Sequence, residues 1–189
     1  MSITIHFTLN GHYKTVEADE TERAQSLLKR LGIASVRDSD NHEGFAGSDT
    51  ILLDGKPASA GLLLAPMLEG RDIATIESFH NGRKLSVIEQ SLVDAGCVQS
   101  GYNAPAAALL LGELLDRKPD PSRTDVIDAL SGLFNRATGY EQFFYAAQLA
   151  GARLREASYS TDTIPSFRED LEIVGKPSPK NDAVRLLSG

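Results

Sequence analysis

The stretch ITIHFTLNGHYKTV, residues 3–16, decides the fold of the first half of the chain. Apolar and polar residues alternate over residues 3–9, which is typical of a half-buried strand. Asn10-Gly11 is the strongest short hairpin signal, and residues 13–16 supply the return strand. The chain therefore begins with an antiparallel β-hairpin.

A helix and three further strands are expected between this hairpin and residue 77. Helical apolar spacing predicts a helix over residues 20–31, closed by Gly32. The further strands are short apolar runs at residues 51–53, 62–64 and 73–76. The polar segment 34–50 is a long loop for a compact domain. This order predicts an α+β domain over residues 1–77.

The second half of the chain changes to helical spacing after a polar linker at residues 78–84. Four helices are predicted, at residues 85–95, 104–116, 125–133 and 140–156. Ser122 or Thr124 can cap the third. We therefore expect a four-helix domain over residues 85–156. Residues 157–189 are polar and contain three prolines, so they are expected to form an extended tail.

Composition narrows the classes of function. The 189 residues carry a net charge of -7, which argues against a nucleic-acid binder. We read no secretory signal and no membrane-spanning segment, so the expected location is cytoplasmic. The single cysteine, Cys97, allows no intramolecular disulfide and no multi-thiolate metal site.

Five segments carry a family resemblance: FTLNGH (7–12), LLDGKPASAGLLLA (52–65), IATIES (73–78), GCVQSGYNAP (96–105) and ALSGLFNRATGY (129–140). Together they resemble the small iron–sulfur subunit of the molybdenum hydroxylases, the relatives of xanthine dehydrogenase and carbon monoxide dehydrogenase. The resemblance implies a plant-type ferredoxin-like (β-grasp) domain followed by a four-helix bundle. The order of predicted elements agrees with this fold.

In that family each of two 2Fe-2S clusters is held by four cysteines, because iron and sulfide need soft, anionic ligands. None of those cysteines is found in this chain at the positions that match. In the helical domain the positions fall on Ser100, Asn103, Asn135 and Ala137. In the first domain they fall on Asp40 or Asn41, Phe45 or Ala46, Ser48 or Asp49, and Gly61. The resemblance therefore implies two degenerate cluster sites and no cofactor in this chain.

Two other features of the resemblance concern partners. Gln99 matches the family's glutamine that approaches the pterin held by the large subunit; a buried glutamine bonded to backbone is the simpler alternative. Residues 172–189 resemble the opening of that large subunit. The implied partners are a large molybdopterin-type subunit and, as a further option, a flavin-binding medium subunit, with molybdopterin and FAD held there. No nucleic acid or membrane partner is expected.

Other reactive side chains have simpler interpretations. The loop at 38–49 contains Asp38, Asp40, His42, Glu43 and Asp49, but its spacing matches no calcium loop, so we expect a solvated loop and no metal. Cys97 is expected to be a small buried apolar residue, because no histidine near it in sequence could activate a thiol. No catalytic residue is expected in this chain.

The sequence thus favours a non-redox structural subunit of a xanthine dehydrogenase-like complex. Two alternatives stay open. The complex could carry out altered or non-redox chemistry in its large subunit, or the chain could be a free-standing binding or scaffold module.

Overall fold

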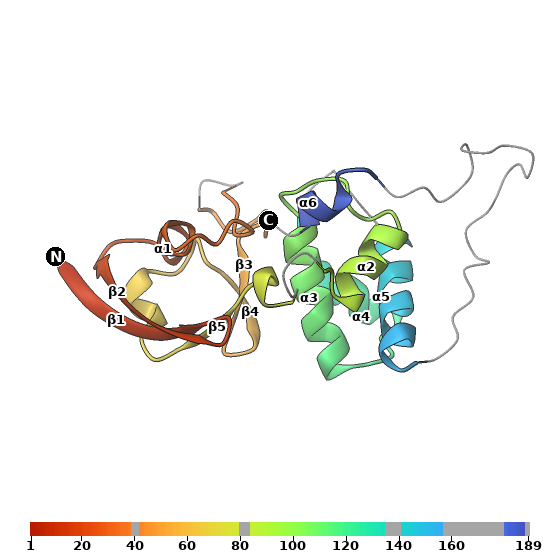
Figure 1. Cartoon of the computed structure of the whole chain (residues 1–189), viewed down its shortest axis with the longest axis horizontal. Coiled ribbons are helices and arrows are strands. Elements are labelled where there is room, and N and C mark those ends of the chain that lie inside the picture. Colours follow the sequence, from red (N-terminus) through yellow and green to blue (C-terminus); the bar gives the residue numbers. More distant parts are fainter. Residues whose placement is uncertain (39–41, 80–83, 135–140, 157–179, 188–189) are drawn as a thin grey trace, which may run out of the picture.

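The computed structural model describes residues 1–38, 42–79, 84–134, 141–156 and 180–187. The strands and the main helices form two lobes that lie side by side (Figure 1). The first lobe contains a five-stranded sheet with one helix, and the second contains the longer helices.

The sheet of the first lobe is mixed. Its strands are β1 (Ser2–Leu9), β2 (His12–Asp19), β3 (Thr50–Leu53), β4 (Lys56–Ser59) and β5 (Asp72–Ala74), in the order β2-β1-β5-β3-β4. Only β1 and β5 are parallel neighbours. The predicted hairpin is confirmed: Asn10 and Gly11 both have positive φ, 51° and 77°, as a type I′ turn requires.

One predicted strand is wrong. Residues 62–64 form no strand; Leu64 makes an isolated bridge with Arg23, and the Leu63 carbonyl accepts from the N–H of Ala24. The strand that pairs with β3 on the side away from β5 is β4, which follows directly after the Asp54-Gly55 turn. Pro57 lies in β4, and this is tolerated because β4 is an edge strand.

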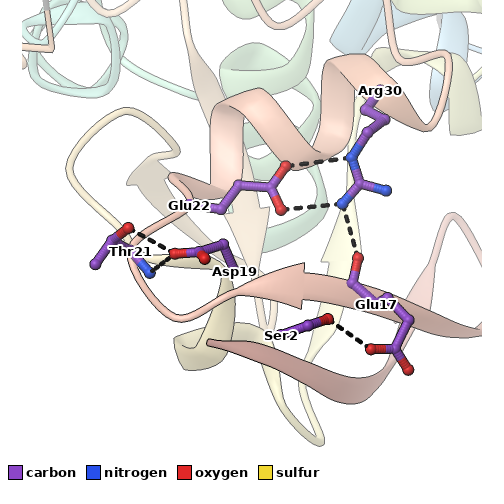
Figure 2. Close-up of polar contacts among 6 residues, drawn as sticks. All are labelled: Ser2, Glu17, Asp19, Thr21, Glu22 and Arg30. Carbon is purple, nitrogen blue, oxygen red and sulfur yellow. Dashed lines mark hydrogen bonds and ion pairs between the residues drawn. The ribbon is translucent and has the colours of Figure 1, made fainter.

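The first helix, α1 (Ala24–Arg30), begins later than the predicted residue 20. Figure 2 shows the reason: the Asp19 carboxylate accepts hydrogen bonds from the Thr21 N–H, at 2.9 Å, and from the Thr21 hydroxyl, at 2.6 Å. This local turn competes with helix formation. Arg30 then ties the helix to its entry segment, because its guanidinium donates to Glu22, at 3.0 Å, and to the Glu17 carbonyl, at 2.8 Å.

The first lobe has its own apolar core between the sheet and α1. Alternate residues of β1 are buried, as the alternating pattern predicted. The largest fully buried side chains of this core are Phe7, Leu27, Leu28, Ile51, Leu68 and Ile73. Leu68 comes from the short 3-10 helix η1 (Ala65–Leu68).

Four helices form most of the second lobe: α2 (Val87–Asp94), α3 (Ala104–Arg117), α4 (Arg123–Leu130) and α5 (Glu141–Leu154). Ser122 caps α4 in a capping box with Asp125, so the predicted cap is confirmed. Closure of these helices into a four-helix bundle stays a prediction, since residues 135–140 lie outside the described part.

The sequence predicted an extended tail over residues 157–189, and this prediction is wrong for its last described part. Residues Ala183–Leu187 form a short helix, α6, next to α3 and α2 (Figure 1). Ala183 and Leu187 belong to the core of the second lobe, with 2% and 0% of their surface exposed. Burial of these apolar side chains offsets the weak helical preference of so short a segment.

Contacts between β3 and α3 join the two lobes. The segment that leads to the second lobe is tied to the first by Glu77, in the 3-10 helix η2 (Ile76–Ser78), which accepts hydrogen bonds from the Ser35 N–H, at 3.0 Å, and the Ser35 hydroxyl, at 2.7 Å. Gly47 lies directly against the carbonyl of Gly132. The proposed domain boundaries at residues 77 and 84 stay predictions. No helix within the described ranges is long and apolar enough to cross a membrane.

Candidate functional site

The first candidate site lies where the loop after α1 meets the end of β4. Asp49 is 3% exposed, although it lies in a loop that was expected to be solvated. Its Oδ2 atom accepts hydrogen bonds from the Gly61 N–H, at 2.6 Å, and from the Ser59 hydroxyl, at 2.6 Å. Two of the predicted degenerate positions, Asp49 and Gly61, are therefore bonded to each other.

Gly61 is enclosed by polar atoms. A Cβ atom on this residue would lie 2.8 Å from Asp49 Oδ2, 3.2 Å from His42 Nδ1 and 3.4 Å from Gln25 Oε1. Three side chains from separate parts of the chain thus approach one point. Sequence reasoning did not single out Gln25, since it is a polar residue on a predicted helix and nothing local distinguishes it.

The remaining positions of this loop differ in burial. Ala46 and Ser48 are 8% and 1% exposed, whereas Phe45 is 51% exposed. The expectation of a solvated loop is therefore wrong for residues 46–49, which are buried. Asp40 and Asn41 lie outside the described residues.

The second candidate site lies at the start of α3. Ser100 Oγ accepts a hydrogen bond from the Tyr102 N–H at 3.2 Å. Asn103 immediately precedes α3 and is 6% exposed, and its Nδ2 has no hydrogen-bond partner within the described ranges. The two matching positions at Asn135 and Ala137 lie outside those ranges, so the described part of the chain contains only Ser100 and Asn103 of this predicted set.

Gln99 is exposed beside a pocket of about 420 Å³. The pocket is lined by Val93, Gly96, Val98, Gln99, Lys180 and Ala183. Lys180 Nζ donates to the Gln99 carbonyl at 3.4 Å, so the segment before α6 forms part of the wall. Sequence reasoning missed Lys180, which is 81 residues away from Gln99 along the chain.

Cys97 is 1% exposed within the second core, as predicted. Burial raises the pKa of its thiol to about 12, so the reactive thiolate is scarce at neutral pH. Among the residues that the structure describes, no group of three or more His, Cys, Asp or Glu side chains is placed to hold a metal ion.

Comparison with known proteins defines the class of this fold. A family model described as "[2Fe-2S] binding domain" matches residues 75–148. The solved structure of the aldehyde oxidoreductase from Desulfovibrio desulfuricans ATCC 27774 is similar with a TM-score of 0.85 and 25% identity, over 98% of this chain and 21% of that one. Its likeness, with the mixed sheet, fits the expected ferredoxin-like fold of the first lobe.

Sequence relatives narrow the class further. The nicotinate dehydrogenase small FeS subunit of Eubacterium barkeri is 33% identical over 80% of this chain and 96% of its own length. The probable hypoxanthine oxidase XdhD of Escherichia coli (strain K12) is 47% identical over 97% of this chain but 19% of its own length. The chain thus spans about a fifth of that relative. It belongs to the family of small iron–sulfur subunits of the xanthine dehydrogenase-like molybdenum hydroxylases.

Proposed function

We propose that this chain is a non-redox structural subunit of a xanthine dehydrogenase-like complex and holds neither of the family's two clusters. One observation carries the proposal: the whole chain of 189 residues contains a single cysteine. A 2Fe-2S cluster in this family takes four thiolates, so two clusters need eight. The lone thiol, Cys97, is buried among apolar side chains, where its raised pKa disfavours the thiolate that iron would require.

The first site supports the proposal through its donor atoms. Ala46 and Gly61 offer no side-chain ligand, and Asp49 offers a hard carboxylate in place of a soft thiolate. The Oδ2 atom of Asp49 already accepts two short protein hydrogen bonds. These residues do not fit a 2Fe-2S cluster. The proposed function therefore includes no electron transfer through this chain.

A protein without clusters must be stable without their metal–ligand bonds. The two apolar cores provide that stability, since eleven large side chains of these cores, among the residues that the structure describes, are less than 2% exposed. Asp49 accepts hydrogen bonds from the Gly61 N–H and the Ser59 hydroxyl, and these bonds connect the loop to the strand end, which is the connection that a cluster would otherwise supply. The fold can therefore be kept as a scaffold.

The scaffold role implies partners. We propose a large molybdopterin-type subunit as the main partner, with Gln99 and the pocket beside it facing the pterin. Gln99 is exposed, as such a contact needs, and its amide can both donate and accept. In the relative XdhD the matched region is a fifth of a longer chain, which supports a large neighbour of the same kind. A flavin-binding subunit is a further proposed partner.

Metal analysis of the natively expressed protein tests the proposal. The chain is purified aerobically without reconstitution, with any co-purifying subunits, and its iron, acid-labile sulfide and visible absorption are measured. The matched control is the Eubacterium barkeri relative, whose name identifies it as an FeS subunit, prepared in the same way. We expect iron and sulfide in the control and neither in this chain once it is separated from its partners.

Size-exclusion chromatography of the same preparation tests the scaffold role. Co-elution with a chain of large-subunit size supports it. Elution as a monomer with no partner contradicts it and favours a free-standing module. Stoichiometric iron and sulfide in the isolated chain would overturn the proposal as a whole.

A further inference from the structure

Residues 180–187, at the C-terminal end of the described chain, lie on the second lobe and are called the strap here. The strap contains the short helix α6, which lies next to α2 and α3 (Figure 1). A helix of 5 residues is too short to be stable in water without tertiary contacts. The docked position of the strap therefore depends on its contacts with the lobe.

Apolar side chains supply part of these contacts. Ala183 and Leu187 lie in the core of the second lobe, and Leu186 packs against that core. Leu186 also lies against Gly101, where an added Cβ would be 3.1 Å from Leu186 Cδ2. Gly101 belongs to the segment between α2 and α3, two residues after Gln99. The docked strap therefore packs directly against the segment that carries Gln99.

Lys180 adds a polar contact with Gln99 itself. Its ammonium group donates to the Gln99 carbonyl at 3.4 Å and forms an ion pair with Asp182, within the strap, at 2.9 Å. The N–H of Gln99 makes a local bond instead, since it donates to the Cys97 carbonyl at 3.1 Å. Lys180 thus connects Gln99 to a segment that is 81 residues away along the chain.

The strap also supplies one wall of the pocket beside Gln99. Two of the lining residues, Lys180 and Ala183, come from the strap, and the others come from α2 and the segment that follows it. The volume of about 420 Å³ lies within the usual range for ligand pockets. A displaced strap would leave this pocket without that wall.

We infer that Lys180 is a positioning residue for Gln99, and that the docked strap holds the Gln99 segment in the conformation that completes the pocket. Opening of the strap breaks the Lys180 contact and releases Gly101 at the same time, because one short segment makes both contacts. A ligand that fills the pocket contacts the strap as well as Gln99, so its binding and the docking of the strap favour each other. Only the identity of that ligand as a pterin rests on the proposed function.

Hydrogen exchange of the full chain, followed by mass spectrometry, tests the inference. Lys180→Met removes the donor and keeps an apolar stem. We expect the amides of residues 97–103 and 180–187 to exchange about three to ten times faster in this variant, as the loss of one hydrogen bond implies. Residues 3–9 should keep the wild-type rate. Lys180→Arg retains a donor and should restore wild-type exchange in both segments.

The matched control is Arg185→Met, which removes the same charge from the same strap. The Arg185 side chain is 80% exposed and lies 3.7 Å from Asp182 Oδ2. We expect unchanged exchange in both segments. Leu186→Ala provides a second test, because it removes the contact with Gly101 and leaves Lys180 in place. Both segments should again exchange faster than in the wild type.

The outcomes separate this inference from the proposed function. Iron and sulfide in the purified chain would overturn the proposed function and leave the coupling between the strap and Gln99 as it stands. Faster exchange of residues 180–187 alone in Lys180→Met would overturn the inference, because the strap would then open without any effect on Gln99. Unchanged exchange in both segments, or equal acceleration in Arg185→Met, would overturn it as well.

Discussion

The carboxylate of Asp49 accepts a hydrogen bond from the backbone N–H of Gly61 across 2.6 Å. The family resemblance predicts lost cluster ligands at Gly61 and at Ser48 or Asp49. The bond joins the buried end of the loop to the second residue after β4. Protein hydrogen bonding thereby connects two segments that are 12 residues apart along the chain.

This contact predicts a coupled pair of mutations. Gly61→Ala places a Cβ 2.8 Å from Asp49 Oδ2 and should lower the free energy of unfolding by about 1–3 kcal/mol, since neither group has room to move. In an Asp49→Ala background the added cost of Gly61→Ala should be smaller by about 1 kcal/mol. Urea unfolding of the four proteins measures this coupling.

Gly132→Ala is the control for that cycle, because nothing lies within 4 Å of a Cβ there. Its unfolding free energy should stay within about 0.5 kcal/mol of wild type, as is usual for an open surface position. Strictly additive effects at Asp49 and Gly61 would contradict the predicted contact.

Substitution of Gly47 tests how much the contact between the lobes contributes to the free energy of unfolding. Its φ is +72°, and a Cβ would clash with the Gly132 carbonyl oxygen and lie 2.9 Å from Leu133 Cδ2. Gly55 has a similar φ of +76° with nothing within 4 Å, so Gly55→Ala isolates the backbone strain, about 1–2 kcal/mol. Gly47→Ala should lower the unfolding free energy by more than Gly55→Ala; equal losses in chemical denaturation would argue against the packed contact.

Leu187 predicts that α6 is part of the folded second lobe. Its side chain is fully buried, so Leu187→Ala should cost about 2–5 kcal/mol of unfolding free energy. Val184, on the same helix, is 47% exposed and provides the matched control. Val184→Ala should be nearly neutral. If both variants unfold at the same urea concentration as wild type, the helix does not belong to the core.

Asp125 predicts a pH dependence of stability. The Asp125 carboxylate accepts hydrogen bonds from the Lys118 ammonium and from Ser122. These bonds, chiefly the one from Lys118, lower the pKa of Asp125 from 3.8 to about 2. A folded-state pKa below the unfolded one gives stability that is present above about pH 4 and is lost as the pH falls toward 2. The stability difference between wild type and Asp125→Asn should therefore be constant above pH 5 and shrink below pH 4.

Urea unfolding at each pH checks this, with Asp116→Asn as the control, because Asp116 is exposed. The Asp116 variant should follow the wild type at every pH. A difference for Asp125→Asn that stays constant down to pH 2 would contradict the shifted pKa.

Local sequence signals predicted most elements correctly because they act over a few residues. The Asn10-Gly11 turn requires positive φ at both positions, and few other pairs supply it. The strand at residues 62–64 and the early start of α1 were predicted wrongly for a tertiary reason. Leu63 and Leu64 bond to the residues that begin α1, and an Asp19–Thr21 turn delays the helix.

The sequence alone determined how many thiolate ligands the chain can offer to a cluster, since the number of cysteines does not depend on the fold. One cysteine in 189 residues restricts the cluster chemistry whatever the conformation. Only the tertiary structure decided that Gln25, His42 and Asp49 converge beside Gly61, and that Leu187 enters a core. Such contacts depend on how distant segments pack, and no periodicity within a single segment encodes them.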